Sequence, residues 1–184
     1  SHWYLGLLRD SRVAARRLCQ ILATSSYVAE RMSELPESVE WLDDDHQLEA
    51  PNKERLDHEV RALVERHTDT GEAMDRIRQV RARELLRSAI VDLNDRVDPV
   101  RAGRMISHAN DACLAGALTA ARRAVEGAES DIEVALVAMG RQGGREASYG
   151  SDADVVAVYR PREGVSASHV ATSGVAVAQA LKKG

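Results

Sequence analysis

The chain has 184 residues, 44% of them apolar, so it can bury a core in one large domain or two small ones. Its formal net charge of −4 is mild and spread along the chain, which leaves no electrostatic case for nucleic-acid binding. No apolar run approaches membrane-spanning length and the first residues lack a signal-peptide pattern, so we expect a cytoplasmic protein that binds neither nucleic acid nor membranes.

Helical patterns dominate the chain up to about Val125. Two early stretches, 13–22 and 27–35, are closed by Pro36, because proline cannot continue a helix. A short apolar turn then leads into the acidic segment DDDHQLEAPN, residues 43–52, which we expect to form a surface loop.

Longer amphipathic patterns follow this loop. One helical face carries Leu56, Val60, Leu63 and Val64, and a second carries Met74, Ile77, Leu85, Ala89, Ile90 and Leu93. A further helix should start at Asp98, as its cap, with Pro99 in the first turn. We therefore predict a helix bundle over residues 1–128, with Cys19 and Cys113 as reduced thiols in helix cores.

The pattern changes at residues 126–131. The segment IEVALVAMG, 132–140, is short, apolar and ends in glycine, which predicts a buried strand. DADVVAVYR, 152–160, predicts a second strand, and SHVATSGVAVAQALKK, 168–183, predicts a final helix. Residues 129–184 therefore indicate the beginning of an α+β domain, and the chain as a whole an α+β protein that is mostly α.

Two carboxylates stand at the start of the second predicted strand. Because side chains alternate along a strand, Asp152 and Asp154 should point to the same side. Adjacent carboxylates repel unless a cation or a proton lies between them. Their hard oxygen atoms suit Mg²⁺, which commonly binds one or two carboxylates together with substrate phosphates.

A glycine-rich turn precedes the pair. Glycines such as Gly143 and Gly144 let backbone N–H groups approach an anion closely, and Ser151 adds a hydroxyl. Turn, hydroxyl and carboxylate pair together predict a phosphate-and-metal site for a nucleotide. Two aspartates can also merely keep an edge strand soluble, but the apolar flanks and the adjacent turn favour the functional interpretation.

The segment GRQGGREASYGSDADVVAVY resembles the signature of the glutamine synthetase adenylyltransferases, a branch of the polymerase-beta-like nucleotidyltransferase superfamily. That signature is G-[KR]-x-G-G-x-E followed shortly by S-D-x-D and an apolar strand. The matching positions are Gly140, Arg141, Gly143, Gly144, Glu146, Ser151, Asp152 and Asp154. WYLGLLRDS, LCQILATSSYVAERM and RARELLRSAIVDLND resemble the helical segment that precedes the catalytic domain, so the resemblance covers nearly the whole chain.

The resemblance is to the C-terminal, adenylylating half of the actinobacterial enzymes, whose two halves each contain a nucleotidyltransferase domain. It implies that residues 129–184 form the first part of such a domain, with a small mixed sheet. The family's third metal carboxylate lies on a later strand, so we expect a fragment that is inactive alone. Gln142 departs from the family, which usually has an apolar residue there, and we expect an effect on packing more than on chemistry.

The implied function is transfer of AMP from ATP to a tyrosine of glutamine synthetase when nitrogen is plentiful. Asp152 and Asp154 would be catalytic Mg²⁺ ligands. The nucleotide would be bound by Gly143, Gly144, Ser151 and Arg145. Implied partners are glutamine synthetase and a PII-type nitrogen-signalling protein.

Two other functions stay open. The deadenylylating half of the same enzymes runs phosphorolysis through the same site design, and a degenerate domain could bind nucleotide or partner for regulation without chemistry. An intact D-x-D pair favours chemistry, and the upstream WYLGLLRDS favours the adenylylating half. We expect His108, within a helical stretch, to lie at the core edge and Glu146 to fix the glycine turn.

Overall fold

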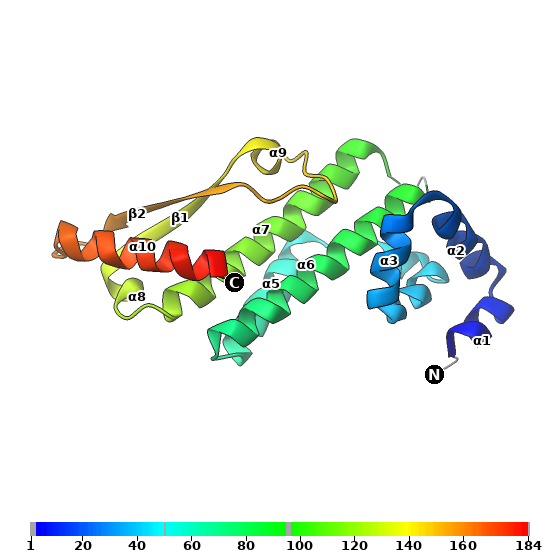
Figure 1. The fold of residues 1–184 in the computed structure, drawn as a ribbon, viewed down its shortest axis with the longest axis horizontal. Helices are drawn as coiled ribbons and strands as arrows, with labels where there is room; N and C mark the ends of the chain where they lie inside the picture. The colour runs from blue at the N-terminus through cyan, green and yellow to red at the C-terminus, as the bar shows by residue number, and fades with distance from the viewer. Residues whose placement is uncertain (1–2, 50, 95–96, 184) are drawn as a thin grey trace.

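Two long helices, α6 (Thr70–Leu93) and α7 (Pro99–Arg123), lie side by side through the middle of the molecule (Figure 1). The computed structural model describes residues 3–49, 51–94 and 97–183. The other elements are α1 (Trp3–Asp10), α2 (Arg12–Thr24), α3 (Ser26–Glu34), the 3₁₀-helix η1 (Pro36–Leu42), α4 (Asp45–Leu48), α5 (Lys53–Arg66), α8 (Ala128–Asp131), β1 (Ile132–Ala138), α9 (Gly140–Gly143), β2 (Val155–Pro161) and α10 (Ala167–Lys183). This confirms an α+β fold that is mostly α.

Capping side chains set the starts of the helices. The Asp98 carboxylate accepts a hydrogen bond from the Arg101 amide and Pro99 opens α7, which confirms the predicted start. The predicted break at Pro36 is also confirmed, since α3 ends before it. The acidic segment 43–52 is not only a surface loop, because it contains α4, whose Leu48 is buried in the core.

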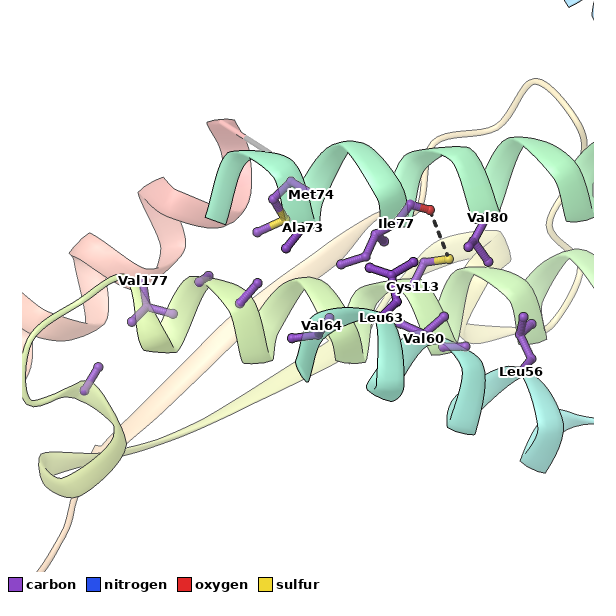
Figure 2. Packing of buried hydrophobic residues seen from close by; sticks show 14 of the residues in the cluster. Leu56, Val60, Leu63, Val64, Ala73, Met74, Ile77, Val80, Cys113 and Val177 are labelled. Atoms are coloured by element: carbon purple, nitrogen blue, oxygen red, sulfur yellow. Dashed lines mark hydrogen bonds between the residues drawn. The ribbon is translucent and has the colours of Figure 1, made fainter. Parts of the chain in front are cut away.

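The helical core lies between α5, α6 and α7 (Figure 2). Gly116 of α7 lets α5 approach closely, since a side chain there would collide with Val60. Cys113 is buried in this core, whereas Cys19 is exposed, so the prediction that both thiols lie in helix cores is wrong for Cys19. Cys19 lies on the solvent-facing side of α2, whereas Cys113 lies on the side of α7 that packs into the core.

The same core continues into the C-terminal part of the chain. Ile132 of β1 and Val177 of α10 are fully buried in the cluster that contains the α5–α7 residues. On α10, Gly174 leaves room for the ring of Tyr159, whose atoms would lie 2.6 Å from an added Cβ. Helix α10 therefore packs on α7, and the hairpin packs on α10 and α8, within the same hydrophobic cluster.

Strands β1 and β2 form an antiparallel hairpin, with Ala138 opposite Val155 and Ile132 opposite Pro161. The sheet begins at Ile132, as predicted. The second strand begins at Val155, three residues after the predicted start at Asp152, because β1 gives way to the α9 turn at Gly140. None of the helices in the described ranges is long and apolar enough to cross a membrane.

Candidate functional site

The glycine-rich turn folds as the single helical turn α9 directly after β1. The Gly143 amide donates to the Met139 carbonyl at 2.9 Å, and the Gly144 amide donates to the Gly140 carbonyl at 3.0 Å. A Cβ on Gly143 would lie only 2.6 Å from the carbonyl oxygen of Ala138, so no larger residue fits. The two amides thus close the turn, and the missing side chain lets it fold back on β1.

Asp154 faces this turn across the hairpin. Its carbonyl accepts the Met139 amide at 2.8 Å, which extends the pairing of the strands by one residue. A Cβ on Gly140, whose φ is +51°, would lie 3.6 Å from the Asp154 Oδ2 atom. Because Gly140 has no side chain, it does not cover the Asp154 carboxylate, which stays exposed to solvent.

The aspartate pair alternates with Ala153 in an extended segment that leads into β2. Asp152 and Asp154 are exposed and Ala153 is half-buried, so both carboxylates lie on the outer side of the chain. Among the described residues, neither carboxylate forms an ion pair or a side-chain hydrogen bond. Unlike the aspartates at positions 10, 45, 57 and 75, which pair with Arg or Lys, these two form no ion pair with a described residue.

This donor set fits part of a magnesium site. Two exposed carboxylates without a cationic partner supply hard oxygen ligands, and Mg²⁺ typically takes one or two of these and keeps several waters. Within residues 3–49, 51–94 and 97–183, no group of three His, Cys, Asp or Glu side chains is close enough together to hold a metal ion. Asp152 and Asp154 could therefore hold Mg²⁺ together with phosphate oxygens.

The Ser151 hydroxyl shapes the turn before Asp152. It accepts a hydrogen bond from the Ser148 amide at 2.9 Å and donates to the Ser148 carbonyl at 2.8 Å. The Ser151 side chain therefore stabilises the backbone turn that precedes Asp152. A contact with a nucleotide would be a second role.

Arg145 lies at the C-terminal end of the α9 turn, with a φ of +58° in the left-handed region. Its guanidinium lies 3.0 Å from Nε2 of His108 on α7. His108 is half-buried, at the edge of the core as predicted. Arg145 itself is exposed and remains accessible to a ligand.

Gln142 is the site residue whose contacts the sequence did not reveal. It is 2% exposed, and its side chain bonds to α7: Nε2 donates to the Ser107 carbonyl at 3.0 Å and to the Asp111 carboxylate at 2.8 Å. The only signal in the sequence was a polar residue between glycines, at a position that is usually apolar in the resembled family.

The loop from Gly144 to Ser151 is fastened to the helical bundle. Ala147 packs against Leu85 and Ile106, and the Tyr149 hydroxyl donates to the Asp92 carboxylate at 3.0 Å. Burial, followed by this hydrogen bond, raises the pKa of Tyr149, so the phenol stays protonated. Helices α6 and α7 thus hold the loop that joins the glycine turn to the aspartates.

Comparison with known proteins identifies the family to which the chain is similar. The model of the family described as glutamate-ammonia ligase adenylyltransferase matches residues 15–183. A bifunctional glutamine synthetase adenylyltransferase/adenylyl-removing enzyme of Leifsonia xyli subsp. xyli is 39% identical over 95% of this chain and 17% of its own length. Enzymes with the same description from Cutibacterium acnes and Streptomyces avermitilis are 39% and 35% identical over 90% and 98% of this chain.

This chain covers only 16% and 20% of these last two relatives, so it spans a small part of the proteins that it resembles. No solved structure matches it significantly.

Proposed function

Because the chain belongs to the glutamate-ammonia ligase adenylyltransferase family, we propose that it carries part of a site that transfers AMP from ATP to a tyrosine of glutamine synthetase. In this reaction the tyrosine oxygen attacks the α-phosphorus of ATP. The bond from that phosphorus to the oxygen bridging to the β-phosphorus breaks, and pyrophosphate leaves with the bonding electrons. The tyrosine proton passes to the third carboxylate that the resemblance implies on a later strand.

Within this reaction the chain supplies binding and orientation. Asp152 and Asp154 would hold Mg²⁺, and the ion would supply neutralisation of the charge that develops on the leaving pyrophosphate. The α9 turn lies beside Asp154 and is followed by Gly144 and by Arg145, which is exposed, as is Arg141 within the turn. Positioning and charge stabilisation of this kind account for most of the catalysis of phosphoryl-type transfers.

One observation carries the proposal. Asp152 and Asp154 are both exposed on the same side of the chain, Asp154 lies against Gly140, and neither forms an ion pair with a described residue. Such a pair repels itself unless a ligand cation is bound, so its arrangement serves ligand binding and contributes nothing to stability. The family membership supplies the nucleotide and the acceptor.

We assign this chain to the adenylylating half because its upstream segment WYLGLLRDS resembles that half. We also expect a PII-type protein to regulate the complete enzyme. Transfer in this direction consumes ATP, whereas the adenylyl-removing direction consumes phosphate. The two directions are therefore separable by the co-substrate that each requires, ATP for transfer and phosphate for removal.

The first prediction concerns the aspartate pair. In the full-length enzyme, Asp152→Asn or Asp154→Asn should abolish transfer of labelled AMP to glutamine synthetase and leave the thermal midpoint nearly unchanged. The midpoint should hold because the substitution removes a charge that repels its neighbour and has no cationic partner.

Glu163→Gln is the matched control, since it neutralises another exposed carboxylate in the segment after β2. It should leave the transfer rate unchanged. Near-normal transfer by either aspartate variant would contradict the metal assignment and favour a domain that binds nucleotide or partner without chemistry.

A further inference from the structure

A continuous chain of side-chain hydrogen bonds runs from α6 through α7 into the α9 turn. The Arg81 Nε atom donates to the Asn110 Oδ1 atom at 2.8 Å, and the Asn110 Nδ2 atom donates to the Gln142 Oε1 atom at 2.9 Å. Gln142 then donates both of its amide hydrogens to α7, to the Ser107 carbonyl and the Asp111 carboxylate. We call Arg81, Asn110 and Gln142 the polar relay.

The polar relay is buried where it meets the turn. Asn110 is 1% exposed and Gln142 is 2% exposed, so neither side chain can exchange its partners for bulk water. A buried amide that loses a partner keeps the cost of desolvation without the compensating bond. The α9 turn is therefore held to one position on α7, the one in which all of these bonds form together.

The same relay reaches the other side of the site. The second nitrogen of the Arg81 guanidinium donates to the Ser151 carbonyl at 3.5 Å, and Ser151 directly precedes Asp152. Gln142 stands between Gly140, which faces the Asp154 carboxylate, and Gly143, which closes the turn on β1. One arginine of α6 thus contacts both the backbone that leads to Asp152 and, through Asn110, the turn that faces Asp154.

We propose that Arg81, Asn110 and Gln142 are positioning residues, through which helices α6 and α7 set the spacing between the glycine turn and the aspartate pair. The proposal rests on the proposed function for its catalytic consequence. Its structural content, that the relay fixes residues 139–151, stands independently. None of the three side chains is required to touch the nucleotide. Helices α6 and α7 of the bundle then contribute to the geometry of the site.

The second prediction tests this relay with Gln142→Glu in the full-length enzyme. The substitution keeps the size of the side chain, but it turns an oxygen toward the Asp111 carboxylate and the Ser107 carbonyl, where two N–H donors stood. Gln47→Glu makes the same chemical change on an exposed glutamine of α4 and is the matched control. Arg81→Met removes the donors at the other end of the relay and keeps most of the stem.

Two measurements separate positioning from general stability. Hydrogen exchange should become faster in the peptide 139–151 of both relay variants and stay unchanged in the peptide 56–66 of α5. The Mg²⁺ concentration for half-maximal AMP transfer should rise about tenfold, the lower end of the effect of losing groups that support metal ligands. That concentration does not depend on how much of the enzyme is folded.

The proposal is overturned if both variants lower the thermal midpoint or the active fraction while the Mg²⁺ requirement and the exchange of 139–151 match the Gln47→Glu control. If Gln142→Glu does not fold, Arg81→Met decides by the same two measurements. Failure of the proposed function would appear differently, as AMP transfer that survives Asp152→Asn. The exchange of 139–151 reports on the relay whatever reaction the site performs.

Discussion

The side chains of Asp152 and Asp154 have no ion-pair or hydrogen-bond partner among the described residues. Most charged side chains of the described helices have partners: Arg83, for example, bonds to Glu59 and to Glu84, and Glu84 is 4% exposed. The aspartate pair has neither a partner nor burial. At the residue scale this contrast separates the pair from carboxylates such as Glu84 that stabilise the fold, and its place beside the glycine turn separates it from other exposed carboxylates such as Glu163.

The third prediction concerns one of the stabilising carboxylates. Glu59 of α5 accepts hydrogen bonds of 2.8 and 3.0 Å from Arg83 of α6, which hold the pKa of Glu59 below its ordinary value of 4.5. A carboxyl whose pKa is lowered by folding adds stability above its unfolded pKa and loses it as the pH falls through the folded value. The pair is partly exposed, so its contribution should be below about 1 kcal/mol.

Glu59→Gln should therefore lower the urea midpoint at pH 7, and its difference from the unsubstituted chain should shrink as the pH falls below about 4.5. Urea denaturation measured at several pH values checks this. A difference that stays the same down to acidic pH would show that the hydrogen-bond geometry of the pair matters and its charge does not.

At the scale of elements, local chemistry made several boundaries predictable. Asp98 and Pro99 carry their own signal for the start of α7, and the β-branched run fixes the start of β1. The start of β2 was missed because a strand also needs a partner. Residues 152–153 have the right composition, but β1 has already turned into α9 opposite them.

The contacts of the site depended on partners too distant for sequence patterns. Gln142 bonds to residues 31 to 35 positions earlier, and Arg81 reaches Ser151 across 70 positions. The position of the aspartates on one side followed from alternation alone and needed no such partner. The sequence could therefore predict which residues face outward at the site, but not which buried residues hold them.

The fourth prediction tests the close approach of α5 and α7. Gly116→Ala should destabilise the chain by about 1–3 kcal/mol, because its Cβ would overlap Val60 and press on Ile77 and Val64 at 3.4 Å. Gly6→Ala in α1 is the control, since nothing lies within 4 Å of that position. Urea midpoints should fall for Gly116→Ala and hold or rise for Gly6→Ala. Equal midpoints would mean that α5 can move aside without cost.

At the scale of the whole molecule, bundle and hairpin share one core. One hydrophobic cluster contains Leu56 of α5, Ile132 of β1 and Val177 of α10. The polar relay joins the bundle to the α9 turn, at the other end of β1. A change in the packing of α6 against α7 would therefore strain the hydrogen bonds that hold the α9 turn.

The fifth prediction concerns the direction of the reaction. If residues 152 and 154 serve the adenylylating half, the Asp152→Asn, Asp154→Asn double variant of the full-length enzyme should fail to transfer labelled AMP from ATP to glutamine synthetase. It should still release AMP from adenylylated glutamine synthetase in the presence of phosphate, because that reaction belongs to the other half. Both directions are followed with the same labelled adenylyl group, with Glu163→Gln as the control. Loss of the forward transfer alone is the result that the account predicts, and loss of the phosphate-dependent release with forward transfer intact would contradict it.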